Sequence, residues 1–420
     1  DTSPDADTAT MEERHAREDP LLPHLSFKVR SGDSLVQEVG GINLGRMETT
    51  KGLPPDLKNR LNKLKSDKQD YYHNYTERHP KSKQALEWEE FQLFRAILQH
   101  RIHIKQEEQK KHLRTIEVLE GERALIGGEP VITKKNEAEI VIQKQLIAEK
   151  EFECKQYQQA LESLKLPKNV PFVWEIAFAE VFVEEKDRGF DIVIGNPPYV
   201  RQEQILDPRL PRIVAMTRES KQLYKTKLAR SVYQAFTDFF RYNEMKGTAI
   251  HKIDLKSDLY IYFYLYGLKL LNPKGTFCFI TSNSWLDVGY GADLQEFLLK
   301  YCRIKMILDN QVKRSFSTAD VNTVISLFSA PSEKPGEEEL NHIARFVMFK
   351  VTFEHILSAD IFKQIEQTQE RTATPEYRVY PIIQKALLEE GLKPLEKDVK
   401  EVTLSERTGK LATSPLLKEA

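Results

Sequence analysis

The sequence is most constrained at residues 190–199, which read FDIVIGNPPY. The first five residues form a short, mostly apolar run of the kind that makes a buried strand, and Gly195 then leads into a loop. The loop contains two consecutive prolines. Each proline fixes its own φ and pushes the preceding residue out of the helical region. This segment therefore predicts a strand that ends in a rigid loop.

The loop Asn196-Pro197-Pro198-Tyr199 suits the binding of an amino group attached to a planar ring. The side-chain oxygen of Asn196 and the carbonyl of Pro197 can accept hydrogen bonds from its two N–H groups. Such bonds draw the nitrogen toward a tetrahedral geometry, in which its lone pair can attack a methyl donor. Tyr199 offers a stacking face to a base extruded from its helix. An ordinary turn is the alternative, but ligands of parallel sheets bind beyond the carboxyl ends of strands, which favours a site.

Further motifs occur along the chain. They are GDSL at residues 32–35, PFVWEIAFAEVF at 171–182, GFDIVIGNPPYVRQEQI from 189, DLYIYFYLYGLKLLNPKGTFCFITSNSWL at 258–286 and RSFSTADVNTVISLF at 314–328. In this order they resemble the adenine-specific N6 DNA methyltransferases of fused type II restriction-modification enzymes. The resemblance implies an enzyme that transfers a methyl group from S-adenosylmethionine to the N6 amino group of a flipped adenine in double-stranded DNA.

The resemblance also implies roles for two residues outside the NPPY loop. Asp33 of GDSL matches the carboxylate that accepts a hydrogen bond from the adenine amino group of S-adenosylmethionine; the alternative is a capping residue of a loop. Phe316 matches the aromatic residue that packs on the second face of the flipped adenine, and its alternative is a core residue. Tyr199 and Phe316 would then enclose the base, with about 1–3 kcal/mol for each stacking contact.

A basic run follows the NPPY loop. Between residues 209 and 230, Glu219 is the single acid among seven basic residues, which are Arg209, Arg212, Arg218, Lys221, Lys225, Lys227 and Arg230. Its position favours contacts with the phosphates beside an extruded nucleotide over a solvated helix face.

The composition limits the class of protein. With 30% charged residues and a net charge of −1, the chain has no global basic field, so a nucleic-acid surface must be local. It has no apolar stretch long enough for a membrane and no basic-then-apolar signal. Three cysteines without close pairing are typical of reduced thiols in the cytoplasm. His100, His103 and His112 lack an accompanying Glu motif, so we predict no metal site.

The chain order of the segments predicts an α/β fold. We expect a disordered leader at 1–22, a cofactor-side strand and GDSL loop at 23–50, a helical insertion at 51–168, a catalytic core at 169–332 and the start of a target-recognition region at 333–420. The insertion is rich in Lys, Glu, Gln and Leu and predicts a helical hairpin that turns at GGEP, residues 127–130. Strand–helix alternation after residue 171 predicts a mostly parallel, Rossmann-like methyltransferase sheet that lacks its first strands.

Short strands are expected at residues 25–29, 191–194, 276–281, 305–308, 323–328 and 376–381. The clearest helix is expected over 258–271, with Ser257 or Asp258 as its N-cap and the NPKG segment at 272–275 as its stop.

The family's glycine-rich cofactor loop and the acid after its second strand do not occur before GDSL. A further polypeptide segment would have to supply that loop and the rest of the target-recognition domain. Two other interpretations stay open: the same chemistry on RNA or protein glutamine, or a methyltransferase remnant that acts as a helical interaction module. No endonuclease constellation is found, so we predict no restriction activity for this segment.

Overall fold

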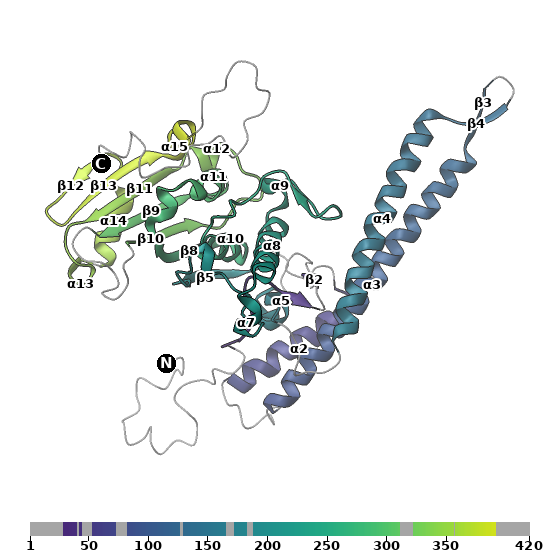
Figure 1. Ribbon diagram of the computed structural model, residues 1–420, viewed down its shortest axis with the longest axis horizontal. Coiled ribbons are helices and arrows are strands. Elements are labelled where there is room, and N and C mark those ends of the chain that lie inside the picture. Colours follow the sequence, from purple (N-terminus) through teal and green to yellow (C-terminus); the bar gives the residue numbers. More distant parts are fainter. Residues whose placement is uncertain are drawn as a thin grey trace. The chain divides into compact units, whose positions relative to one another are not determined.

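The computed structural model describes residues 28–39, 42–43, 53–72, 82–126, 129–164, 172–182, 188–310, 322–356 and 358–391. The chain divides into two compact units, Asp1–Glu185 and Lys186–Ala420. Figure 1 shows the elements of each unit. The expected leader at 1–22 lies outside the described residues, as does most of the strand expected at 25–29.

The first unit is mainly helical. Its elements are β1 (Glu38–Val39), β2 (Ile42–Asn43), α2 (Pro55–Tyr72), α3 (Lys83–Gly121), β3 (Arg123–Ile126), β4 (Glu129–Ile132), α4 (Lys134–Ser163), α5 (Trp174–Ala177) and α6 (Ala179–Phe182). The side chains of Ser82 and Thr133 accept hydrogen bonds from backbone N–H groups in the first turns of α3 and α4, which fixes where these helices begin. α3 and α4 pack side by side as a long hairpin (Figure 1). The segment expected as a plain turn joins them through the antiparallel pair β3–β4.

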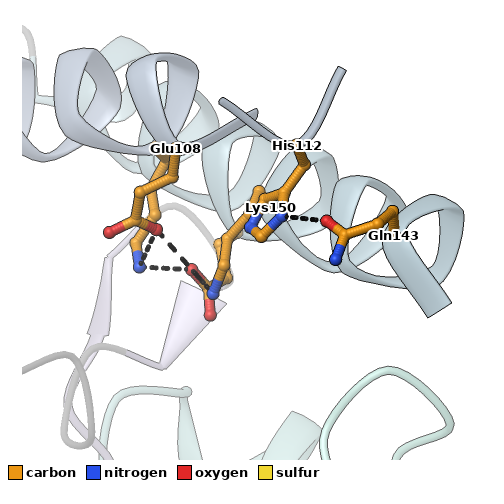
Figure 2. Close-up of polar contacts among 6 residues, drawn as sticks. Glu108, His112, Gln143 and Lys150 are labelled. Atoms are coloured by element: carbon orange, nitrogen blue, oxygen red, sulfur yellow. Dashed lines mark hydrogen bonds and ion pairs between the residues drawn. The ribbon is translucent and has the colours of Figure 1, made fainter. Parts of the chain in front are cut away.

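The seam between α3 and α4 changes character along its length. Near the start of α3, Phe94, Ile97 and Leu98 are completely buried in an apolar cluster that includes Tyr157 and Ala160 of α4. Farther along, the seam is polar, as Figure 2 shows.

In this polar layer, Lys105 Nζ lies 2.8 Å from Glu153 Oε2 and 3.2 Å from Glu108 Oε2. His112 Nδ1 is 2.6 Å from Gln143 Oε1 (Figure 2). Burial opposes the charge of Lys105, but the two carboxylates outweigh it and raise the pKa of this lysine. Paired polar groups within a helix seam set the register of one helix against the other.

The second unit is built on a seven-stranded sheet in the order β12-β13-β11-β9-β10-β8-β5. The strands are β5 (Phe190–Gly195), β8 (Leu271–Ser282), β9 (Ile304–Asn310), β10 (Thr323–Ser329), β11 (Ile343–Phe349), β12 (Thr372–Ala373) and β13 (Tyr377–Ile383). β6 (Tyr242–Asn243) and β7 (Thr248–Ala249) form a separate pair.

The expectation of a mostly parallel sheet is wrong for the described strands. Only β5–β8 and β11–β9 pair in parallel, whereas the other four neighbouring pairs are antiparallel. β5, β8, β9 and β11 do run in one direction, as strand–helix alternation predicts. However, β10 lies between β8 and β9 and is antiparallel to both.

Helices connect and cover these strands. They are α7 (Arg212–Ala215), α8 (Arg218–Ala235), α9 (Thr237–Phe240), α10 (Leu259–Lys269), α11 (Ala292–Tyr301), α12 (Glu337–Leu340), α13 (Phe353–Ile356), α14 (Ala359–Gln367) and α15 (Gln384–Gly391), with short 3-10 turns η3 (Gln202–Gln204), η4 (Asn283–Leu286) and η5 (Gly289–Gly291). No described helix is long and apolar enough to cross a bilayer.

The helix α10 ends earlier than the sequence suggests, and NPKG does not separate it from the next strand. These four residues lie inside β8, where the register against β5 shifts: Phe190 pairs with Leu271, but Ile192 pairs with Thr276. The Asn272 side chain holds this irregularity, since Nδ2 donates to Asp191 Oδ1 at 2.7 Å and Oδ1 accepts from Lys274 N–H at 2.9 Å.

The core of the sheet is aromatic where α10 packs on β8. Tyr264 of α10 is completely buried, with its ring 5.3 Å from that of Phe277 and 5.7 Å from that of Trp285. Its hydroxyl lies 2.8 Å from Thr281 Oγ1 on β8 and 3.0 Å from Ser326 Oγ on β10. This one side chain therefore joins α10 to two neighbouring strands.

Candidate active site

The strand β5 carries the NPPY loop at its carboxyl end, as predicted. β5 runs parallel to β8, with Gly195 opposite Phe279. A Cβ atom on Gly195 would lie 2.9 Å from the Phe279 ring, so glycine permits the close approach of the two strands at the point where the loop begins. The NPPY loop therefore begins at a point where β5 and β8 are closely packed.

The two acceptors that the sequence assigns to an amino group lack another partner, although Pro197 itself is buried. Within the described part of the chain, no hydrogen bond engages the Asn196 side chain or the Pro197 carbonyl, and Asn196 is exposed. The next carbonyl, that of Pro198, instead accepts from the Val200 N–H at 2.9 Å. The loop thus uses one carbonyl for its own turn and leaves the two expected acceptors for a ligand.

Tyr199 is held from the sheet side. Its hydroxyl donates a long hydrogen bond of 3.4 Å to the Ile280 carbonyl on β8, and burial raises the pKa of its phenol. The side chain is half-buried. A tyrosine anchored through its hydroxyl presents its ring in a fixed direction, which suits a stacking role.

The residues after NPPY are fastened to the start of α10. The Leu259 N–H donates to the Val200 carbonyl at 3.0 Å, and the Gln202 N–H donates to Asp258 Oδ1 at 2.9 Å. The other carboxylate oxygen of Asp258 accepts from the Tyr290 hydroxyl at 3.1 Å. Asp258 is the N-cap residue of α10, as expected, but its side chain caps no backbone N–H of that helix. Its role in holding the loop was missed, because nothing in the sequence pairs it with Gln202.

A cavity of about 510 Å³ lies beside this loop. Five of its nine lining residues are of charged types, with both signs present; the lining consists of Arg201, Gln202, Glu203, Asp254, Lys256, Asp258, Val288, Gly289 and Tyr290. Burial raises the pKa of the Asp258 carboxyl and raises the pKa of Tyr290 to about 12.

The raised pKa of Asp258 predicts a pH effect on stability. Ionisation of Asp258 costs more in the folded chain than in the unfolded one, so its contribution is greatest in acid and is lost as the pH rises through the folded-state pKa. Asp258→Asn keeps an oxygen for the Gln202 N–H and removes the charge. Urea denaturation at a series of pH values should show the variant gaining on the wild type as the pH rises; parallel curves would contradict this role.

Part of the basic run also supports the loop. Lys221 Nζ donates to the Glu203 carbonyl at 3.1 Å, and Lys225 Nζ donates to Gln202 Oε1 at 2.6 Å. The Arg209 guanidinium donates two hydrogen bonds to the Asp207 carboxylate, at 2.9 Å and 2.7 Å. These three cations therefore have partners inside the chain. Among the others, Arg212, Arg218 and Arg230 are exposed and Lys227 is half-buried.

Asp33 lies in the first unit, where it shapes the GDSL loop. Its Oδ1 accepts from the N–H groups of Leu35 and Val36, at 3.1 Å and 3.0 Å. The indole of Trp174 donates to the Ser34 carbonyl at 3.0 Å, so the GDSL segment and the 171–182 segment lie together. Phe316, the expected second stacking residue, lies outside the described residues.

The comparison with protein families matches residues 79–316, more than half of the chain, to the Eco57I restriction-modification methylase. The chain belongs to this family. The Eco57I-type match includes the α3–α4 hairpin, the NPPY loop and the basic run, which therefore all lie within one methylase segment.

Two curated relatives of this chain are type II methyltransferases. M.BstVI of Geobacillus stearothermophilus is 29% identical over 120 residues, and M.PaeR7I of Pseudomonas aeruginosa is 28% identical over 120 residues. Each match covers 29% of this chain but only 16% and 15% of the respective relatives. Among solved structures, the type IIG restriction endonuclease BpuSI is similar over 72% of this chain and 32% of its own, with 12% identity and a TM-score of 0.35. The type IIL enzyme MmeI is similar over 79% and 42%, with 14% identity and a TM-score of 0.27.

Proposed function

We propose that this chain is the methyl-accepting part of a DNA methyltransferase that modifies the N6 amino group of a flipped adenine. The observation that carries the proposal is the NPPY loop at the end of β5, whose Asn196 side chain and Pro197 carbonyl have no other hydrogen-bond partner within the described residues. Acceptors aimed at the place where charge develops in a transition state accelerate the reaction. Membership of the Eco57I-type family supports a role in a restriction-modification system. We propose that this role is carried out in the cytoplasm.

In this proposal the two acceptors bind the two N–H groups of the adenine and draw its nitrogen toward a tetrahedral geometry. The developing positive charge on that nitrogen then lies beside two partial negative charges, which stabilise it. Tyr199 stacks on one face of the base and Phe316 on the other. The bonds from Asp258, Leu259 and Lys225 to residues 200–202 keep the loop in place while the base enters.

The methyl donor in this proposal is S-adenosylmethionine, which supplies an electrophilic methyl group when bound. Within the described residues, Asp33 is the one candidate for its adenine amino group, and Asp33 Oδ1 already accepts two backbone hydrogen bonds. Binding a ligand of this size with micromolar affinity requires most of its surface to be buried and its charges to be paired. The described residues therefore do not by themselves form a complete donor site.

Calorimetry on the purified 420-residue chain should accordingly show weak binding of S-adenosylmethionine, with a dissociation constant of about 1 mM or weaker. Asp33→Asn should change the measured heats little, because a single contact contributes little without the rest of a site. Tight, saturable binding by the wild-type chain would contradict the incomplete donor site.

The unpaired edge of β5 offers a place where the rest of the methyl-donor site can attach. Within the described residues β5 pairs only with β8, and the side chains of Ile192 and Ile194 are 65% and 76% exposed. The unpaired backbone groups of an edge strand readily bond further strands, and the two exposed isoleucines leave one face of β5 uncovered. We propose that a further polypeptide segment adds strands here and supplies the glycine-rich cofactor loop.

The direct test is the identity of the methylated product. A complete protein that contains this segment should be incubated with labelled S-adenosylmethionine and either duplex DNA, RNA or a protein substrate. Mass spectrometry of the digested DNA should then reveal N6-methyladenine. Label in cytosine, in RNA or in a protein glutamine would refute the adenine assignment.

A further inference from the structure

The segment that follows the NPPY loop has an unusual surface. It exposes five large apolar side chains, hereafter the apolar patch: Leu210 (39% exposed), Ile213 (87%), Val214 (46%), Met216 (55%) and Leu223 (58%). Among the large hydrophobic side chains of the described residues, Ile213 is the most exposed. Arg209, Arg212 and Arg218 are exposed within the same stretch.

Buried residues and two prolines hold the backbone of this segment in place. Ile205 and Ala215 are buried with 0% and 1% exposure, and Asp207 is buried beside them in sequence. The guanidinium of Arg209 binds both carboxylate oxygens of Asp207. Pro208 and Pro211 stiffen the backbone on either side of Arg209. Ile213 is therefore exposed on a short helix, α7, that is held in place, and Ala215 of the same helix packs inward.

The charge around the apolar patch indicates a polyanion. Arg212 and Arg218 are exposed in this stretch, whereas Arg209 is paired with Asp207 and Glu219 follows Arg218. An apolar protein surface has no need of such cations, whereas duplex DNA combines phosphates on its outside with an apolar base stack inside. Apolar side chains such as Ile, Leu and Met enter between base steps in many DNA complexes. The patch also belongs to the same unit as the NPPY loop and is tied to it, because Lys221 donates to the Glu203 carbonyl.

We propose that Ile213, with Val214 beside it, inserts into the base stack of double-stranded DNA next to the flipped adenine, while Arg212 and Arg218 contact the neighbouring phosphates. The proposal rests on the proposed function, since extrusion of the adenine leaves the gap in the stack that Ile213 fills. An apolar side chain that fills this gap offsets the cost of unstacking. Ile213 is therefore a residue that positions the DNA for catalysis in this proposal.

A duplex with a pre-formed gap tests this role without any methylation step. The wild-type chain should bind a duplex that carries one abasic residue about tenfold more tightly than the intact duplex, because the unstacking cost is already met. Ile213→Ala should remove this preference and leave the affinity for the intact duplex unchanged. Ile213 is so exposed that the variant should fold normally. Ile250→Ala, which alters another exposed isoleucine (70%) outside the basic run, should keep the full preference.

The arginines should behave differently. The double variant Arg212→Ala and Arg218→Ala should weaken binding to both duplexes alike and reduce the slope of log affinity against log salt by about two. Equal binding of the two duplexes by the wild type, or a full preference in Ile213→Ala, would overturn the insertion. A change in oligomeric state on sedimentation of Ile213→Ala, with its DNA preference intact, would assign the patch to a protein interface instead. If methylation were absent while the preference for the abasic duplex stayed intact, the result would contradict the proposed function but not the insertion of Ile213.

Discussion

Asn196→Ala should lower the rate of methyl transfer about 100- to 1,000-fold in a complete protein that contains this segment, because it removes a hydrogen bond made to the reacting nitrogen in the transition state. Binding of DNA should persist, since Asn196 is exposed and holds no part of the fold. The rate is measured under single-turnover conditions, alongside an equilibrium binding assay on the same DNA.

A matched variant separates this effect from a general loss of activity. Asn341→Ala changes another exposed asparagine in the same unit, at the end of α12 and outside the site, and should retain the wild-type rate. Wild-type turnover by Asn196→Ala would remove Asn196 from the reaction. Loss of DNA binding together with turnover would show that it acts on affinity instead.

Tyr264→Ala should destabilise the second unit by about 3–5 kcal/mol, since it empties a fully buried aromatic site between α10, β8 and β10. Tyr264→Phe should cost less, about 1–3 kcal/mol, because it leaves the hydroxyls of Thr281 and Ser326 without this partner. Hydrogen exchange of β8 and β10 amides in increasing urea measures both changes within the unit concerned.

The control for this comparison is Tyr380→Phe on β13. Tyr380 is half-buried and its hydroxyl makes no hydrogen bond within the described residues, so loss of the hydroxyl should change the exchange little. If Tyr264→Phe matched this control, the hydroxyl would not join the two strands. If Tyr264→Ala also changed the exchange as little as Tyr380→Phe does, the stability of the aromatic core would not depend on the Tyr264 ring.

The sequence predicts best where local chemistry decides the structure. The β5 strand and its rigid loop follow from an apolar run and two prolines, and the long helices follow from composition and capping residues. Strand β11 was not foreseen, although IARFVMF is apolar enough, because no motif marked it. The sheet order failed because alternation predicts the direction of strands, whereas the place of β10 is set by pairing between residues distant in the chain.

The candidate site shows the same division. The place of NPPY at a strand end was predicted from the local sequence and is confirmed, whereas its role in methyl transfer stays a prediction. The bonds of Asp258 to Gln202 and of Lys225 to Gln202 join segments separated by 56 and 23 residues, and no local pattern announces them. Lys225 was predicted to contact phosphate from its charge and its place after the NPPY loop, and neither reveals which neighbour a side chain meets.

The position of β10 between β8 and β9 has a consequence for how the chain assembles. β8 and β9 are joined through α11 but share no ladder, so neither can complete its pairing when it leaves the ribosome. The middle of the sheet closes only after Ser329 has been synthesised, when β10 fills the space between its two predecessors. Until then the apolar edges that β8 and β9 present to β10 stay open to other nascent chains, so the arrival of β10 closes the middle of the sheet before β11, β13 and β12 extend it.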